Sequence, residues 1–117
     1  MAIAGPGARF PYLHVTLRVR DRVYQAEALL DTGFDGDAII PVTRTADLGG
    51  ADNYQRWRLA DGSRLLAPVY LGNLSVSGQP GFSARVAAVG DEYLIGLGAI
   101  RGFKVTLDHG RTVTVEP

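Results

Sequence analysis

The residue best placed to do chemistry is Asp31, which follows the apolar pair Leu29-Leu30 and precedes Thr32 and Gly33. An apolar strand end partly removes a carboxylate from water, and Gly33 frees the backbone to turn sharply beside it. Burial raises the pKa of a carboxylic acid, and a second carboxylate nearby splits the pair into one protonated and one ionised group. Such a pair can activate water and protonate a departing amide nitrogen without a metal or a covalent intermediate.

A structural role for Asp31 is the alternative. Aspartate and glycine are common turn residues, because the short carboxylate accepts backbone N–H groups. The triplet Asp31-Thr32-Gly33 occurs once among the 117 residues. Taken by itself, it fits a turn-forming aspartate better than a catalytic one.

The composition describes one ordinary globular domain. The chain is 46% hydrophobic and 21% charged, and its length suits a single core. Twelve basic residues balance twelve acidic residues, and Lys104 is the only lysine, so no basic patch is expected to attract nucleic acid. We expect one domain over residues 10–117, preceded by a lead-in over residues 1–9.

Several site classes are disfavoured by the residues present. Without cysteine there is no disulfide, thiolate nucleophile or Cys-based zinc site. His14 and His109 lack neighbours at ligand spacing, so we expect neither a metal nor a cofactor. Residues 1–7 lack the features of a signal peptide and no segment is long enough to cross a membrane, so we expect a cytoplasmic protein without membrane contact.

The first half of the chain predicts short strands around Asp31. Residues 12–20 and 23–30 alternate apolar and polar side chains, which is typical of half-buried strands joined by a turn. A third strand is expected over residues 38–40. About two helical turns are expected over residues 43–48, closed by Gly49-Gly50.

The second half of the chain is also strand-rich. Two runs between Tyr54 and Tyr70 flank Ala60-Asp61-Gly62-Ser63, and Asp-Gly is a strong hairpin signal. The further expected elements are strands over residues 71–77, 82–89, 93–95, 103–107 and 112–115 and a short helix over residues 96–101. Short strands at this regular spacing indicate an all-β barrel or sandwich.

The whole sequence resembles the retropepsin-like aspartic proteases, especially the small bacterial branch that carries Asp-Thr-Gly-Phe. Residues 29–34 are similar to the active-site loop, and Tyr93-Leu94-Ile95-Gly96 is similar to a hydrophobic-hydrophobic-glycine element of this family. The hairpin over residues 54–70 falls where the family places its flap, and residues 100–108 resemble bacterial members. The resemblance covers residues 10–116.

The resemblance implies a closed acid-protease β-barrel with one or two short helices and one lobe per chain. Asp31 is then the catalytic aspartate, Thr32 hydrogen-bonds to its twin across a dimer axis, and Gly33 lets the loop turn. Because the chain supplies one such aspartate, the second must come from a symmetry mate, which implies a homodimer acting on polypeptides at acidic pH.

The same resemblance implies the residues that contact a peptide. They are Ala28, Phe34, Asp35, Ala60, Asp61, Gly62, Ser63 and Ile95. Trp57 is either a residue of the flap base or ordinary core.

The sequence departs from the pattern at Leu97 and Gly98. Leu97 stands where viral relatives have a basic residue that pairs with an acid after the triplet, and many relatives have an acid in place of Gly98. Asp35 therefore lacks its usual partner, and Asp35 and Asp37 are either solvated turn residues or substrate contacts. Their spacing does not match a calcium loop.

Two other functions remain open. One is a dimeric peptide-binding or regulatory module that keeps the fold without useful catalysis, for which Leu97 is the main argument. The other is a small-molecule binder that uses the barrel mouth with Arg58, Arg64 and Arg85.

Overall fold

The chain forms short strands with almost no helix. The computed structural model describes residues 2–3, 11–58, 61–110 and 112–117. The strands are β1 (Ala2–Ile3), β2 (Tyr12–Val19), β3 (Arg22–Leu30), β4 (Ala38–Ile40), β5 (Asn53–Arg58), β6 (Arg64–Val76), β7 (Phe82–Ala88), β8 (Leu94–Ile95), β9 (Lys104–Asp108) and β10 (Thr112–Glu116). Two short helices are η1 (Val42–Thr45) and α1 (Leu97–Ile100).

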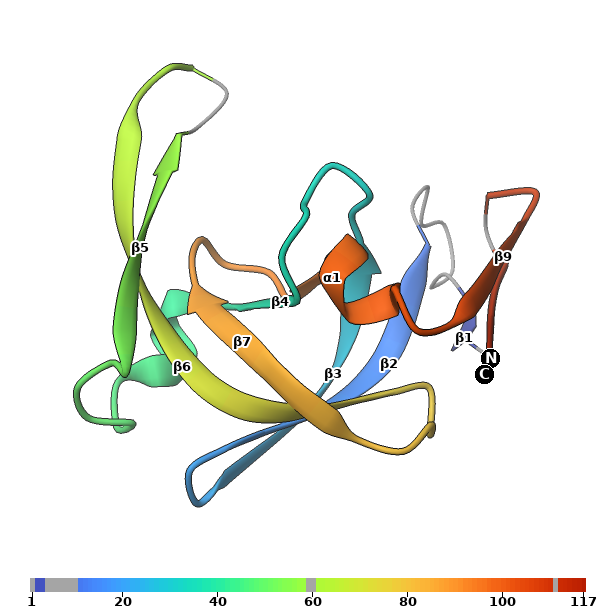
Figure 1. The fold of residues 1–117 in the computed structure, drawn as a ribbon, viewed down its shortest axis with the longest axis horizontal. Helices are drawn as coiled ribbons and strands as arrows, with labels where there is room; N and C mark the ends of the chain where they lie inside the picture. Colours follow the sequence, from blue (N-terminus) through green and yellow to red (C-terminus); the bar gives the residue numbers. More distant parts are fainter. Residues whose placement is uncertain (1, 4–10, 59–60, 111) are drawn as a thin grey trace.

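Six strands close into a barrel. The order is β2-β3-β8-β4-β7-β6, and β6 also pairs with β2, which completes the circuit (Figure 1). Strand β5 pairs with β6 and extends the sheet outward as a projecting hairpin, and β1, β10 and β9 form a separate small sheet. The expected all-β closed barrel with short helices is confirmed.

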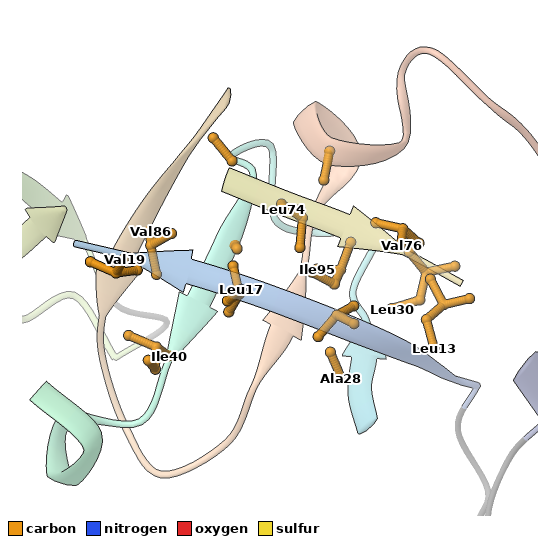
Figure 2. Packing of buried hydrophobic residues seen from close by; sticks show 14 of the residues in the cluster. Leu13, Leu17, Val19, Ala28, Leu30, Ile40, Leu74, Val76, Val86 and Ile95 are labelled. Atoms are coloured by element: carbon orange, nitrogen blue, oxygen red, sulfur yellow. The ribbon is translucent and has the colours of Figure 1, made fainter. Parts of the chain in front are cut away.

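Alternation along the strands builds the core. Strand β2 buries Leu13, Val15, Leu17 and Val19, each at most 1% exposed, while its intervening residues face outward. These side chains pack inside the barrel with residues from β4, β6, β7 and β8, such as Ile95 (Figure 2). Full burial of a leucine or valine side chain stabilises the fold by about 1.5–3 kcal/mol.

Strand β6 is one continuous strand of 13 residues. The expectation of a break between residues 70 and 71 is therefore wrong. The first part of β6 pairs with β5, and the rest pairs with β7 and β2. Gly72 permits the crossing, because a Cβ at this position would lie 2.6 Å from the carbonyl oxygen of Arg18 on β2.

The helix expected over residues 43–48 is shorter than predicted. Helix η1 spans Val42–Thr45, where the Thr45 hydroxyl donates a 2.8 Å hydrogen bond to the carbonyl oxygen of Val42. This local bond competes with α-helical hydrogen bonding, and the chain changes direction at Gly49, where φ is 79°.

No helix in the described part of the chain is long and apolar enough to span a membrane.

Candidate active site

The loop that contains Asp31 is fixed to the segment around α1 by backbone hydrogen bonds. Strands β3 and β8 run parallel, and the N–H of Asp31 donates to the carbonyl oxygen of Ile95 at 2.9 Å. Beyond the strands, the N–H of Leu97 donates to the carbonyl oxygen of Phe34 at 2.8 Å, and the N–H of Gly98 donates to the carbonyl oxygen of Gly36 at 3.0 Å. The two motifs singled out in the sequence therefore form one unit.

Two glycines make this close contact possible. A Cβ at Gly96 would overlap the carbonyl oxygen of Gly36 and lie 2.6 Å from that of Phe34. A Cβ at Gly98 would lie 2.5 Å from Asp37 Oδ1 and 2.9 Å from the carbonyl oxygen of Gly36. The departure at Gly98 therefore has a structural reason, because the Asp37 carboxylate occupies the space that a side chain would need.

Asp31 lies at the end of β3, where the barrel meets an open cleft. Its side chain is half-buried, and Oδ1 accepts a 2.9 Å hydrogen bond from the N–H of Gly33. The N–H of Phe34 donates to the Asp31 carbonyl oxygen at 3.2 Å, which closes the turn. The turn-forming role is thus real, and it fixes the direction of a carboxylate that lines the cleft. Thr32 and Gly33 are exposed on the outside of this turn.

The cleft beside Asp31 has a volume of ≈ 580 Å³. One wall is the Asp31 loop with Phe34 and Asp35, and another wall is β5 with residues 55–58. Its remaining lining residues are apolar, namely Ile39, Val89 and Leu94. The lining thus combines two carboxylates and two arginines with an apolar surface, so the cleft can contact both polar and apolar groups of a ligand.

Phe34 and Trp57 join the two walls of the cleft. Their ring centroids lie 5.3 Å apart with the planes tilted by 35°. Both pack on a small apolar cluster of Ile39, Val69 and Ala87, so Trp57 serves both as core and as a cleft residue. Trp57 Nε1 is buried and has no hydrogen-bond partner within the described ranges.

Two expected pocket residues lie in the core. Ala28 is 0% exposed and Ile95 is 1% exposed, and both belong to the main hydrophobic cluster inside the barrel. In the single chain they support the Asp31 loop from beneath and do not line its cleft. Strand alternation explains this placement, since both side chains point inward from the two parallel strands.

The hairpin tip lies away from the Asp31 cleft. Asp61 and Ser63 form a turn in which Asp61 Oδ1 accepts hydrogen bonds from the Ser63 N–H at 2.8 Å and its hydroxyl at 2.5 Å. These bonds lower the pKa of Asp61, and Gly62 has φ 88°. The tip projects beyond the barrel (Figure 1), and Ala60 lies outside the described residues.

A polar contact anchors the base of the same hairpin. Asp52 Oδ2 accepts a 2.8 Å hydrogen bond from the N–H of Leu71, and Asp52 Oδ1 lies 3.3 Å from Arg20 Nη2. Arg20 also donates to the carbonyl oxygens of Leu48 and Gly50. The Leu71 N–H bond, followed by the Arg20 bond, lowers the pKa of Asp52 despite partial desolvation. Arg20 therefore ties the β2–β3 turn to the start of the hairpin.

The other acidic groups near the site differ in their contacts. Asp37 Oδ2 accepts a 2.9 Å hydrogen bond from the N–H of Arg85, so it is held by β7. Asp35 is exposed at the cleft, and Leu97 is 40% exposed. No group of three potential ligands that could hold a metal occurs among the described residues.

Sequence reasoning missed much of the cleft wall. The missed residues are Ile39, Gln55, Arg56, Val89 and Leu94, and Arg58 was not expected to line the same cleft as Asp31. The alternation of β5 offered a signal, since it puts Gln55 and Trp57 on one face of the strand. Which other strand faces that side depends on barrel closure, and local patterns do not show it.

Comparison with known proteins agrees with the geometry at the level of the fold. No protein-family model matches the chain, and no curated protein matches its sequence. The solution structure of the simian foamy virus (mac) protease is similar with a TM-score of 0.54 and 17% identity, covering 75% of this chain and 91% of that one. A retropepsin-like aspartic protease from Rickettsia conorii gives a TM-score of 0.54 and 17% identity, covering 92% of this chain and 84% of that one. The chain therefore has the retropepsin-like aspartic protease fold.

Proposed function

We propose that this protein is an aspartic endopeptidase that acts as a homodimer, with one Asp31 carboxylate from each chain. The observation that carries the proposal is the position of Asp31, held by Ile95 at the end of β3 with its carboxylate lining an open cleft. Similarity to a viral and a bacterial protease supports the same chemistry.

Dimerisation is needed because one carboxylate cannot serve as both acid and base in this mechanism. A twofold axis beside the Asp31 loop brings identical loops together, since an isologous interface places each residue opposite its own copy. Thr32 and Gly33 are exposed on this loop and Leu97 lies next to it, so these residues would meet the second chain. Thr32 would hydrogen-bond to the partner loop.

The reaction follows from a carboxylate pair that shares one proton. The ionised carboxylate takes a proton from a water molecule while the water oxygen attacks the peptide carbonyl carbon. The protonated carboxyl donates its proton to the carbonyl oxygen. The tetrahedral intermediate then collapses: the C–N bond breaks, the protonated carboxyl gives its proton to the departing nitrogen, and one hydroxyl of the intermediate returns its proton to the ionised carboxylate, which restores the pair. No metal or other cofactor is needed for this sequence of steps.

The peptide would lie extended in the cleft between the Asp31 loop and the β5–β6 hairpin. Phe34 and Asp35 would contact it from the loop side. Ala60, Asp61, Gly62 and Ser63 would act as a flap tip that closes over the peptide, with Gly62 as a turn point. The base of this flap is held by Arg20 and Asp52.

A dimeric peptide-binding module without catalysis is the second candidate. Leu97, 40% exposed where a basic partner for Asp35 would be expected, favours it. The two functions differ in one distance: carboxylates that share a proton lie within hydrogen-bond contact across the axis, whereas a binding module tolerates separated ones.

The direct test is Asp31→Asn, assayed for cleavage of casein or a peptide library at acidic pH and for thermal unfolding. Asp91→Asn is the matched control, because Asp91 is exposed and outside the cleft. Loss of cleavage in Asp31→Asn alone, with unfolding temperatures near that of the original protein, supports the proposal. Cleavage that persists in Asp31→Asn contradicts it.

A further inference from the structure

A second groove lies on the outer surface of the barrel, where β2, β6 and β7 are adjacent. Its volume is ≈ 600 Å³. The charged residues that line it are three arginines and one aspartate, namely Arg18, Arg20, Arg85 and Asp37. In a chain whose basic and acidic residues balance, this is a local excess of positive charge.

Strand register explains why the arginines gather there. Arg18 of β2 pairs with Asn73 of β6, and Leu71 of β6 pairs with Arg85 of β7. Alternation turns all four side chains outward, because their neighbours along each strand face the core or, at Gly72, have no side chain. Gly72 lies between Leu71 and Asn73 and also lines the groove, and it allows β2 to approach, because a Cβ there would lie 2.6 Å from the carbonyl oxygen of Arg18.

The arginines are not equivalent. Arg20 is engaged in the fold through Leu48, Gly50 and Asp52, and its guanidinium lies 5.1 Å from the centroid of the Tyr70 ring. For Arg18 and Arg85, by contrast, no ion pair occurs within the described part of the chain. Both side chains are exposed, so they can bind an anionic group from outside.

A smaller cavity of ≈ 230 Å³ lies between this groove and the Asp31 cleft and shares lining residues with both. Asp37 and Arg85 line both the groove and the smaller cavity. Phe34 and Trp57 line both the smaller cavity and the cleft. The cleft, the smaller cavity and the groove are therefore neighbours, separated by side chains that line two of them at once.

We propose that the groove binds an acidic segment of the polypeptide substrate, at a distance from the bond that is cut. The inference rests on the proposed protease function, and it adds a substrate class: polypeptides in which carboxylates flank an apolar residue. Arg18 and Arg85 pair with the carboxylates, and Leu71, 62% exposed between them, packs against the apolar side chain.

A peptide fits this groove better than a nucleic acid does. Leu71 offers an apolar contact that a phosphate backbone would not use. The formal net charge of zero supplies no long-range attraction for a polyanion. Separate carboxylates with an apolar side chain between them match the groove more closely.

Binding is measured on the full chain carrying Asp31→Asn, so that no cleavage is required. The probe is a fluorescent peptide in which leucine is flanked by glutamates, compared with the same peptide carrying glutamines, by fluorescence anisotropy. The glutamate peptide should bind roughly three- to tenfold more tightly, since exposed ion pairs are individually weak, and added salt should reduce the difference.

The matched variants are Arg18→Gln with Arg85→Gln, and Arg44→Gln with Arg101→Gln as the control. The first pair should abolish the preference for glutamate and the control should keep it, because Arg44 and Arg101 are exposed outside the groove. Equal binding of both peptides to the Asp31→Asn chain overturns the inference, as does tighter binding of inorganic phosphate or single-stranded DNA.

Cleavage by the original chain separates the two claims. If peptides are cut but an attached glutamate segment leaves KM unchanged, the groove inference is wrong and the protease proposal stands. If no peptide is cut but the glutamate preference persists in binding, the groove stands as a docking site and the protease proposal fails.

Discussion

The backbone N–H of Asp31 donates a 2.9 Å hydrogen bond to the carbonyl oxygen of Ile95. This bond joins the end of β3 to the end of β8, and the two bonded residues are 64 positions apart in the sequence. It sets the height of the carboxylate above the barrel core, where Leu30 and Ile95 pack beneath it. The position of the Asp31 carboxylate therefore depends on how closely the Asp31 loop and the end of β8 approach each other.

Gly96→Ala tests that close approach. The added Cβ would overlap backbone oxygens of the Asp31 loop, and backbone cannot move aside as a side chain can. We expect a loss of about 1–3 kcal/mol in the free energy of unfolding, measured by chemical denaturation. Gly102→Ala is the control, because a Cβ there meets nothing within 4 Å. Equal stability of the two variants would refute the close packing described here.

Phe34→Leu tests the contact between the cleft walls. Loss of the ring pair should destabilise the fold by roughly 1 kcal/mol and shift the fluorescence of Trp57, the only tryptophan in the chain. Phe82→Leu breaks a comparable pair with Phe103, whose centroids lie 6.1 Å apart. That control should lower stability but leave the emission maximum unchanged. A shift of equal size in both variants would contradict the pairing of Phe34 with Trp57.

Asp52 makes a pH-dependent contribution to stability. Its pKa in the folded chain is below the ordinary 3.8, chiefly because the Leu71 N–H and then Arg20 stabilise the ionised carboxylate. A lowered folded pKa means that the stabilisation is present above pH 3.8 and is lost as pH falls through the folded value.

Thermal unfolding across the acid range measures this contribution. Above pH 3.8, Asp52→Asn should be less stable than the original chain. Below the folded pKa of Asp52, the unfolding temperatures of the two proteins should converge. Asp91→Asn, on an exposed loop, should show no such convergence. A constant difference between Asp52→Asn and the original chain at all pH values would show that protonation of Asp52 has no part in it.

The pH dependence of cleavage is a separate prediction. A pair of carboxylates works only while it holds one proton, so activity should be highest below neutral pH and fall as alkali removes that proton. The initial rate of peptide cleavage from acidic to alkaline pH measures this, with unfolding followed in parallel. Activity that rises steadily above neutral pH would indicate a different base.

Local sequence patterns predicted the elements near the site closely. Residues 38–40 were expected as a strand and form β4, and the alternation before Asp31 correctly placed the hairpin of β2 and β3. These elements follow from side-chain periodicity and turn residues, which are properties of neighbouring positions. The same signals indicated an all-β barrel or sandwich, and the resemblance to the retropepsin-like proteases selected the closed barrel.

Contacts between distant segments could not be predicted in this way. Gly72 looks like a strand breaker, yet β6 runs through it because Gly72 allows β2 to pass close by. Ala28 and Ile95 were assigned to the pocket by resemblance, but inward alternation buries them. The arginine groove depends on the closure of β6 onto β2, which no short segment reveals.

A subunit-mixing experiment tests the central claim, that each chain supplies one catalytic carboxylate. Original chain and Asp31→Asn chain are refolded together, and cleavage is measured at a fixed amount of original chain. When the two chains are present in equal amounts and pair at random, the activity should fall to about half of its starting value, because mixed dimers hold a single Asp31. Adding Asp91→Asn instead should raise the activity. An activity that stays constant as Asp31→Asn is added would contradict the claim.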